Sequence, residues 1–243
     1  MTRYAIKLEY LGKNYCGSQK QPDRETVQDK LEEALCTLTK TKINTIFSGR
    51  TDKGVNSKGQ IVHFDYDKPI VASRFVNSMN GILPNDIAVS EIKQVPDDFH
   101  AQIWAKKRHY QYKFVNRQQR SVFDDDLMLV RYVCSVERMQ SALNYLLGEH
   151  DFSSFCGADS EVPSKVCIIY SVNCKKVDDT VVLDVVGNRF LYNMIRIIVG
   201  TLLLIEKDNL EPEKMKEILE GKDRSKAGQT VSPNGLTLMK VEY

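Results

Sequence analysis

Apolar and polar residues alternate at the start of this chain, where Tyr4, Ile6, Leu8 and Tyr10 share one side. Such alternation, with β-branched and aromatic residues on the apolar side, is typical of a half-buried strand. The pattern recurs along the chain and predicts strands near residues 3–10, 43–48, 60–66, 86–93, 108–115, 165–176, 179–186 and 236–243.

Apolar residues at helical spacing predict helices between these strands. Thr26 and Asp29 form a capping box ahead of an apolar series that begins at Val27. Ser135 precedes a second series of this kind, and two further helices are expected at about 191–206 and 212–220. Together these elements predict an α+β protein that is rich in sheet.

Composition narrows the class of protein. The 243 residues, 42 % of them hydrophobic and 27 % charged, are enough to bury a core in one large domain or in two joined halves. The longest apolar run, Ile197–Ile205, is shorter than the roughly 20 residues of a membrane span. Because no apolar leader precedes the first strand, we expect a cytoplasmic protein. The net charge of +2 means that an anionic partner must be bound by local clusters of cations.

The six cysteines are spread over the whole chain. None forms a C-x-x-C pair, and only 4 histidines are present, so a zinc site is not expected. In a chain of this length the pattern is typical of small buried apolar residues in a reducing compartment.

The densest polar cluster is the segment 48–60, which contains Gly49, Gly54 and Gly59. Glycines let a ligand approach the main chain closely, and here Arg50 and Asp52 flank the hydroxyl of Thr51. A glycine-rich hairpin turn with a surface ion pair explains the same residues, and composition alone favours that simpler interpretation.

A second anomaly is the segment from Ala105 to Arg120, which holds six cations and no acid. Its aromatic row begins at Tyr110 and is explained either by an ordinary half-buried strand or by RNA binding. Cations neutralise phosphates, and an exposed aromatic ring can stack on an unpaired base. The absence of acids favours RNA modestly. The acids Asp124–Asp126, which follow at once, are expected to face away from any RNA.

The third anomaly is Arg196, which interrupts the apolar helix predicted at 191–206. A charge in that place lies either at the wet edge of the helix or beside a buried carboxylate. Edge exposure is the commoner arrangement, whereas the apolar neighbours on both sides favour a carboxylate partner.

Taken end to end, the sequence resembles the TruA type of tRNA pseudouridine synthase. Each motif is weak alone, but their order and spacing are specific. They are Tyr10-Leu11-Gly12, Gly17 to Gln21, Thr26-Val27-Gln28, Gly49 to Val55, Leu83-Pro84, Phe99-His100-Ala101, Arg108 to Tyr112, Gly148 to Phe152, Phe190-Leu191, Met194-Ile195-Arg196 and Gly235-Leu236.

The resemblance implies roles for the three anomalies. Asp52 is then the catalytic aspartate, Tyr110 stacks on the target uracil, and Arg196 pairs with Asp52. Arg50 and Thr51 are expected to bind substrate. Contacts to RNA are expected from Lys106, Lys107, Arg108 and Arg189.

The resemblance also implies a fold and a partner. The fold is a single catalytic unit of two similar α/β halves, about 1–103 and 104–243, whose mainly antiparallel sheets meet at a central cleft. The family modifies positions 38, 39 and 40 in the anticodon stem-loop of tRNA as a homodimer, without a metal or a small-molecule cofactor.

Several residues depart from the family pattern. Asn56-Ser57 stand where His-Ala is usual, Ser18 stands where Trp is common, and Gln229 with Val231-Ser232-Pro233 replace a Pro-Thr-Ala-Pro-Ala stretch. None of them is Asp52, Tyr110 or Arg196, so the departures put substrate range and loop geometry in question.

Two other classes of protein remain open. One is a non-catalytic RNA-binding module that keeps the scaffold. The other is a hydrolase that uses a carboxylate at a glycosidic carbon, although a retaining enzyme needs a second carboxylate about 5 Å from the first and the loop around Asp52 offers none.

Overall fold

The chain folds into two compact units, which the computed structural model describes over residues 1–124, 127–157 and 162–243. The first unit comprises Met1–Lys106 together with Thr237–Tyr243, and the second comprises Lys107–Leu236. The chain therefore leaves the first unit after Lys106 and returns to it at Thr237. Of the acidic run expected to face away from RNA, Asp125 and Asp126 lie outside the described residues.

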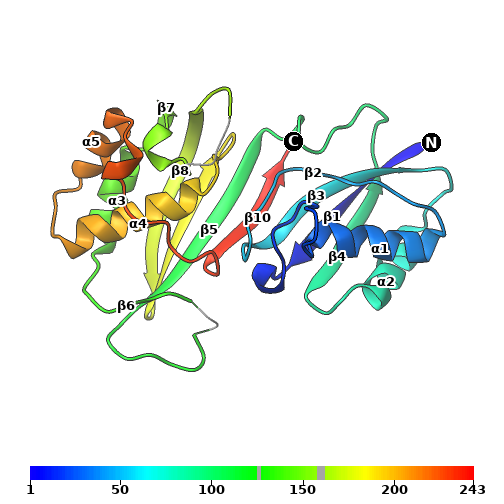
Figure 1. Ribbon diagram of the computed structural model, residues 1–243, viewed down its shortest axis with the longest axis horizontal. Coiled ribbons are helices and arrows are strands. Elements are labelled where there is room, and N and C mark those ends of the chain that lie inside the picture. Colours follow the sequence, from blue (N-terminus) through cyan, green and yellow to red (C-terminus); the bar gives the residue numbers. More distant parts are fainter. Residues whose placement is uncertain (125–126, 158–161) are drawn as a thin grey trace. The chain divides into compact units, whose positions relative to one another are not determined.

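The first unit is built on a mainly antiparallel sheet with the order β4-β1-β3-β10 (Figure 1). The short strand β2 pairs with β3 at Val62 and His63. β10 pairs in parallel with the start of β3, where Thr237 lies opposite Asn56. The strands are β1 (Thr2–Tyr10), β2 (Ile46–Phe47), β3 (Asn56–Tyr66), β4 (Ile87–Gln94) and β10 (Leu236–Glu242).

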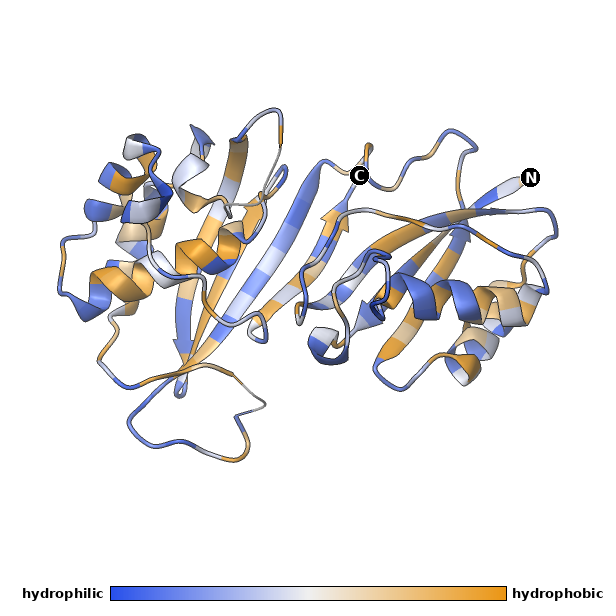
Figure 2. Ribbon diagram, viewed as in Figure 1, coloured by the Kyte–Doolittle hydropathy of each residue, from blue (hydrophilic) through white to orange (hydrophobic). Residues whose placement is uncertain are grey.

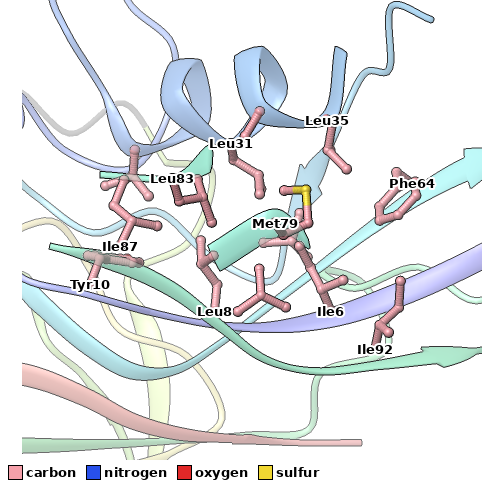
Figure 3. Packing of buried hydrophobic residues seen from close by; sticks show 14 of the residues in the cluster. Ile6, Leu8, Tyr10, Leu31, Leu35, Phe64, Met79, Leu83, Ile87 and Ile92 are labelled. Atoms are coloured by element: carbon pink, nitrogen blue, oxygen red, sulfur yellow. The ribbon is translucent and has the colours of Figure 1, made fainter. Parts of the chain in front are cut away.

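Two helices, α1 (Val27–Thr39) and α2 (Ala72–Ile82), pack on one face of this sheet. The predicted capping box of α1 is confirmed, because Thr26 accepts from the Asp29 amide and Asp29 accepts from the Thr26 amide. Leu31 and Leu35 of α1 face the strand residues Ile6 and Leu8 (Figure 3). Full burial of these leucines and isoleucines contributes about 1.5–3 kcal/mol each.

The sequence analysis missed α2. Its N-cap is Val71, which has no capping side chain, and only Phe75 and Met79 are buried. The helix therefore lacks the start signal that revealed α1, and its stability comes from packing on α1 and β4.

The other face of the first sheet is covered by the segment that follows β4. His63 on β3 is 2 % exposed, and its Nδ1 accepts a hydrogen bond of 3.1 Å from the Ala101 amide. Arg3 donates to the Phe99 carbonyl from the same side. This segment thus gives the sheet a second, smaller core around Ala5, Phe99 and Ala101.

The second unit repeats the plan of a sheet with helices. Its order is β5-β9-β8-β7, with β6 parallel to β5, and the strands are β5 (Lys107–Asn116), β6 (Leu129–Val130), β7 (Gly148–Asp151), β8 (Val166–Val177) and β9 (Thr180–Gly187). β6 and β7 are too short to show alternation and were not predicted.

The helices of the second unit are α3 (Val136–Asn144), α4 (Met194–Lys207) and α5 (Lys214–Gly221). Ser135 caps α3 as predicted, accepting from the Arg138 amide. α4 is apolar along most of its length (Figure 2), and ten of its 14 residues are buried. Its start at Met194, rather than near 191, follows from Asn193, whose left-handed φ of 59° interrupts the helix.

All six cysteines are free thiols. Cys134, Cys156, Cys167 and Cys174 are buried as predicted, whereas Cys16 is half-buried and Cys36 is exposed. Burial raises the pKa of Cys134 and of Cys174 to about 12, which keeps both protonated at neutral pH.

Within the described ranges, no helix has the length and apolar character that crossing a bilayer requires. The same residues contain no group of three His, Cys, Asp or Glu side chains arranged to hold a metal ion.

Candidate active site

The loop that carries Asp52 joins β2 to β3 and is shorter than the sequence predicted. Residues from Asn56 onward already belong to β3, so the loop covers 48–55. A turn closes it, because the Val55 amide donates to the Asp52 carbonyl at 3.1 Å and Gly54 has a φ of 82°. Asp52 is half-buried on this turn.

Ser18 holds the residue just before Asp52. The Thr51 amide donates to Ser18 Oγ at 2.9 Å, and the Ser18 amide donates to the Thr51 carbonyl at 3.1 Å. Ser18 is 0 % exposed and Thr51 is 6 % exposed. Ser18 and Thr51 are therefore joined by two hydrogen bonds, one donated by each residue, in a place that is closed to water.

A buried polar network lies beneath the same loop. The hydroxyls of Tyr10 and Thr51 are 2.8 Å apart, and Gln60 donates to the Gly49 carbonyl at 2.9 Å and to Tyr10 at 3.4 Å. Ser48 in turn donates to the Gln60 side-chain oxygen. Burial raises the pKa of Tyr10, so its hydroxyl stays protonated. Thr51 thus uses its hydroxyl inside the protein, where it holds the loop.

Asn56, one of the departures from the family pattern, also holds the loop. Its Oδ1 accepts a hydrogen bond of 2.8 Å from the Gly12 amide. A Cβ at Gly12 would lie 2.1 Å from the Val55 carbonyl oxygen, so only glycine fits against the end of the Asp52 turn.

Tyr110 lies near the start of β5 in an aromatic row. It is 9 % exposed, compared with 1 % for Tyr112 and 0 % for Phe114 on the same side of the strand. Its ring meets Phe190 edge to face, with centroids 5.2 Å apart. The alternation predicted that at most one end of this row is free; all three residues are buried, and Tyr110 has the largest exposed fraction of the three.

Arg196 lies in the first turn of α4 and is half-buried. Its Nε donates to the Val231 carbonyl at 2.7 Å and its Nη1 donates to Asn193 Oδ1 at 2.6 Å. The next residue of the same segment, Ser232, offers its carbonyl to the Tyr112 hydroxyl at 2.8 Å. The guanidinium is therefore fixed against a strap, residues 228–235, that lies along α4 and β5.

The family departures Gln229 and Val231-Ser232-Pro233 lie in this strap, which is held mainly through its backbone. The Gly228 amide donates to Thr201 Oγ1, and the Lys113 amide donates to the Gly235 carbonyl. The contacts to Arg196 and Tyr112 likewise use backbone carbonyls, which any residue supplies.

The predicted RNA-binding cations differ in exposure. Lys106 and Lys107 are exposed, and Lys107 Nζ lies 5.2 Å from the ring centroid of the exposed Tyr170. Arg50, which was predicted to bind substrate, is exposed as well. Arg108 donates to the Asn188 carbonyl at 2.7 Å, and Arg189 donates to the Ser164 carbonyl at 3.0 Å, so both are partly buried.

The structure assigns the three central residues to different units. Asp52 belongs to the first unit, and Tyr110 and Arg196 belong to the second. The pairing of Arg196 with Asp52 stays a prediction. Sequence reasoning placed Tyr10 on the apolar side of the first strand, but it did not predict that Tyr10, Ser18 and Gln60 hold this loop. Tyr10 and Ser18 lie inside motifs of the resemblance, and Gln60 lies at the end of the polar cluster, but neither position indicated a contact with the loop.

The model of a family described as tRNA pseudouridine synthase matches residues 6–102 and 142–243. This chain belongs to that family. The tRNA pseudouridine synthase A of Bacillus subtilis is 41 % identical over 99 % of each chain. That of Halalkalibacterium halodurans is 43 % identical over 97 % of this chain and 90 % of its own length. That of Brevibacillus brevis is 40 % identical over 100 % of both.

Membership of the tRNA pseudouridine synthase family, an isomerase family, agrees with the resemblance stated from the sequence and with the mixed, mainly antiparallel fold. A solved archaeal box H/ACA ribonucleoprotein complex has a TM-score of 0.38 to this chain, with 9 % identity over 83 % of it and 43 % of the matched chain. That likeness is too low to add to the family assignment.

Proposed function

We propose that this protein converts uridine to pseudouridine at positions 38, 39 and 40 in the anticodon stem-loop of tRNA. The observation that carries the proposal is the half-buried Asp52, held on a turn by buried partners, in a chain of the tRNA pseudouridine synthase family. The protein acts in the cytoplasm.

The reaction is an isomerisation, so its atoms balance without a co-reactant. The N–C glycosidic bond of uridine breaks, the uracil turns while it is held, and a C–C bond forms from its C5 to the same ribose. C5 then loses its proton to solvent and N1 takes up a proton, so the composition is unchanged. Asp52 either attacks the sugar as a nucleophile or removes a proton at its C2′. No redox step is involved, and we propose that no metal or nucleotide cofactor takes part.

Tyr110 acts on the target base in this step, and Arg196 acts on the catalytic carboxylate. The target base is stacked in the stem-loop and must be flipped out, and Tyr110 stacks on the uracil while it turns. Arg196, oriented by Val231 and Asn193, pairs with the Asp52 carboxylate and keeps it ionised.

Recognition of the RNA is mostly by shape and phosphate contacts. Arg50, Lys106 and Lys107 are exposed, and Arg108 and Arg189 are part-buried cations with fixed orientation. Each phosphate that they neutralise makes affinity fall more steeply with salt.

The experiment that tests the function uses an unmodified tRNA transcript labelled with tritium at uridine C5. Pseudouridine formation releases that tritium, so we expect release by the wild type without added metal or nucleotide. Asp52→Asn removes the charge at nearly constant size and is expected to lower the rate at least about 1,000-fold. Glu91→Gln, an exposed carboxylate on β4, is the matched control and keeps the wild-type rate.

Three results would contradict the proposal. Binding of tRNA by the wild type without tritium release favours an RNA-binding module. Release of free uracil favours a hydrolase. Full activity of Asp52→Asn removes Asp52 from the chemistry.

The proposed enzyme is a homodimer in which both subunits contact the tRNA. Light scattering measured together with activity tests this, and a strict monomer that still modifies tRNA would contradict it.

A further inference from the structure

The family pattern gives no role to Ser18, a residue of the first unit that bonds directly to the loop that carries Asp52. It stands where that pattern commonly has Trp, and it is fully buried. Its hydroxyl oxygen accepts from the Thr51 amide at 2.9 Å, one residue before Asp52. We propose that Ser18 is a positioning residue that fixes the Asp52 carboxylate for the reaction. This inference rests on the proposed function.

The contact between Ser18 and Thr51 restrains the two peptide units that flank the Thr51 Cα. The Ser18 amide donates to the Thr51 carbonyl, and the Ser18 hydroxyl accepts from the Thr51 amide, so the backbone on either side of the Thr51 Cα is tied to the same residue. The Asp52 nitrogen is bonded to that carbonyl carbon. A rotation about the φ or ψ dihedral of Thr51, which would shift the Asp52 backbone, would therefore break one of the two hydrogen bonds.

The chain before Ser18 lies close against the same loop. Gly17 has a φ of +97°, and a Cβ there would lie 2.9 Å from the Thr51 carbonyl oxygen. This close approach brings Ser18 near enough for both hydrogen bonds. The short Ser18 side chain reaches the Thr51 amide without displacing it.

Ser18 itself is anchored to the rigid helix α1. The amides of Val27 and Gln28, in the first turn of α1, donate to the carbonyls of Gly17 and Ser18 at 3.3 and 3.0 Å. First-turn amides have no partner within their own helix, so these carbonyls satisfy them. Thr51, which is covalently bonded to Asp52, is thus connected to α1 by hydrogen bonds through Ser18.

Loss of the hydroxyl leaves the buried Thr51 amide without its acceptor. A buried unpaired donor is unfavourable, and the loop relieves it by shifting toward another acceptor or toward water. A displacement of about 1 Å in a reacting group lowers a rate by roughly 100-fold. The effect is expected on the chemical step rather than on RNA binding, because Ser18 is fully buried.

The test compares Ser18→Ala with Ser154→Ala. Ser154 is also 0 % exposed and donates to the Ile218 carbonyl at 2.6 Å, but it belongs to the second unit. Each variant loses one buried hydroxyl. Single-turnover tritium release at saturating tRNA gives the rate of the chemical step, tRNA binding gives Kd, and thermal unfolding gives stability.

For Ser18→Ala we expect a single-turnover rate about 10- to 100-fold lower, with Kd within about 3-fold of the wild type. Ser154→Ala is expected to lose comparable stability at the wild-type rate. If Ser18→Ala does not fold, Ser18→Cys replaces it, with a weak acceptor of similar shape and an expected loss of about 3- to 10-fold.

Equal rates for Ser18→Ala and the wild type would overturn the proposal, and so would a loss confined to Kd. An equal slowing of Ser154→Ala would show that any loss of stability slows the reaction. Absence of tritium release by the wild type is a different result, because it refutes the proposed function itself.

Discussion

The loop that carries Asp52 and the helix that carries Arg196 are held in place by different chemistry. Side chains hold the loop, because Ser18 Oγ and the Tyr10 hydroxyl both bond to Thr51. Next to the loop, Asn56 Oδ1 accepts a hydrogen bond from the Gly12 amide. At Arg196 a backbone group holds the guanidinium, because the Val231 carbonyl accepts a hydrogen bond from Nε. The first region therefore depends on residue identity, whereas the second tolerates change in the strap.

The departures from the family pattern illustrate this difference. In the first region, the unusual residues Ser18 and Asn56 themselves make the hydrogen bonds that hold the loop. In the second region, the unusual residues Val231 and Ser232 contribute backbone carbonyls. Substitutions should accordingly be costly in the loop and mild in the strap.

Apart from loss of the Asp52 charge, the largest effect is expected from Gly12→Ala. The added Cβ would lie 2.1 Å from the Val55 carbonyl oxygen, and backbone must move to admit it. We expect a loss of about 4 kcal/mol in unfolding free energy and at least about 100-fold in activity. Urea denaturation and tritium release measure these two quantities.

Gly81→Ala is the matched control for Gly12→Ala. A Cβ at Gly81, in α2, would meet nothing within 4 Å. Alanine there should stabilise the protein by about 0.5–1 kcal/mol with no change in rate. Similar effects of the two alanines would contradict the close-packing argument.

Acid should weaken the first unit through His63. Burial, with smaller contributions from the charges of Arg3 and His100, lowers the pKa of His63 from 6.5 to about 4. The folded state thus binds this proton less readily than the unfolded state. The stability that neutral His63 contributes is complete above pH 6.5 and is lost as the pH falls toward 4, by at most about 3 kcal/mol.

The protein's single tryptophan, Trp104, reports on this region because its ring lies 5.5 Å from that of Phe99, which also contacts His63. Urea unfolding followed by its fluorescence at several pH values should show the loss. His63→Gln, which has no titrating group, should flatten the dependence between pH 6.5 and 4. Parallel curves for the two proteins would refute the assignment.

The smallest effects are expected around Arg196. Asn193→Ala removes the side-chain partner of Arg196 and places alanine at a φ of 59°, so we expect about 1–2 kcal/mol of destabilisation and about a 10-fold loss of rate. Asn193→Gly removes the same partner without backbone strain, and should recover part of the stability but not the rate.

Val231→Ala keeps the carbonyl that Arg196 uses and should change the rate by less than about 2-fold. A large loss in Val231→Ala, measured by single-turnover tritium release, would show that the strap depends on its side chains. The contrast between the two regions would then disappear.

Local signals in the sequence were enough to predict many of the helices and strands. Thr26 and Asp29 are three residues apart, and the helix after them begins where they predict. The short strands β6 and β7 lack this kind of signal, since two to four residues show no periodicity and their pairing depends on distant strands. Helix α2 was missed because tertiary packing replaces its missing cap.

The candidate site divides in the same way. Asp52, Tyr110 and Arg196 were found as anomalies in composition or in an apolar pattern, and the resemblance then gave them roles. The hydrogen bond between Gly12 and Asn56 joins residues 44 apart, and no local pattern predicts it. The hydroxyl of Thr51 was expected to meet substrate, and its contact with Tyr10 likewise depends on a residue 41 positions away.

The discontinuity of the first unit has a consequence for synthesis on the ribosome. Residues 237–243 complete its sheet on β3, and Tyr243 bonds to the Ala101 carbonyl. The ribosome makes them after the whole second unit, so at about 5–20 residues per second the 130 residues 107–236 take roughly 7–26 seconds. During that interval the edge of β3 that pairs with β10 has no β10 beside it, and another segment of the nascent chain can pair there incorrectly.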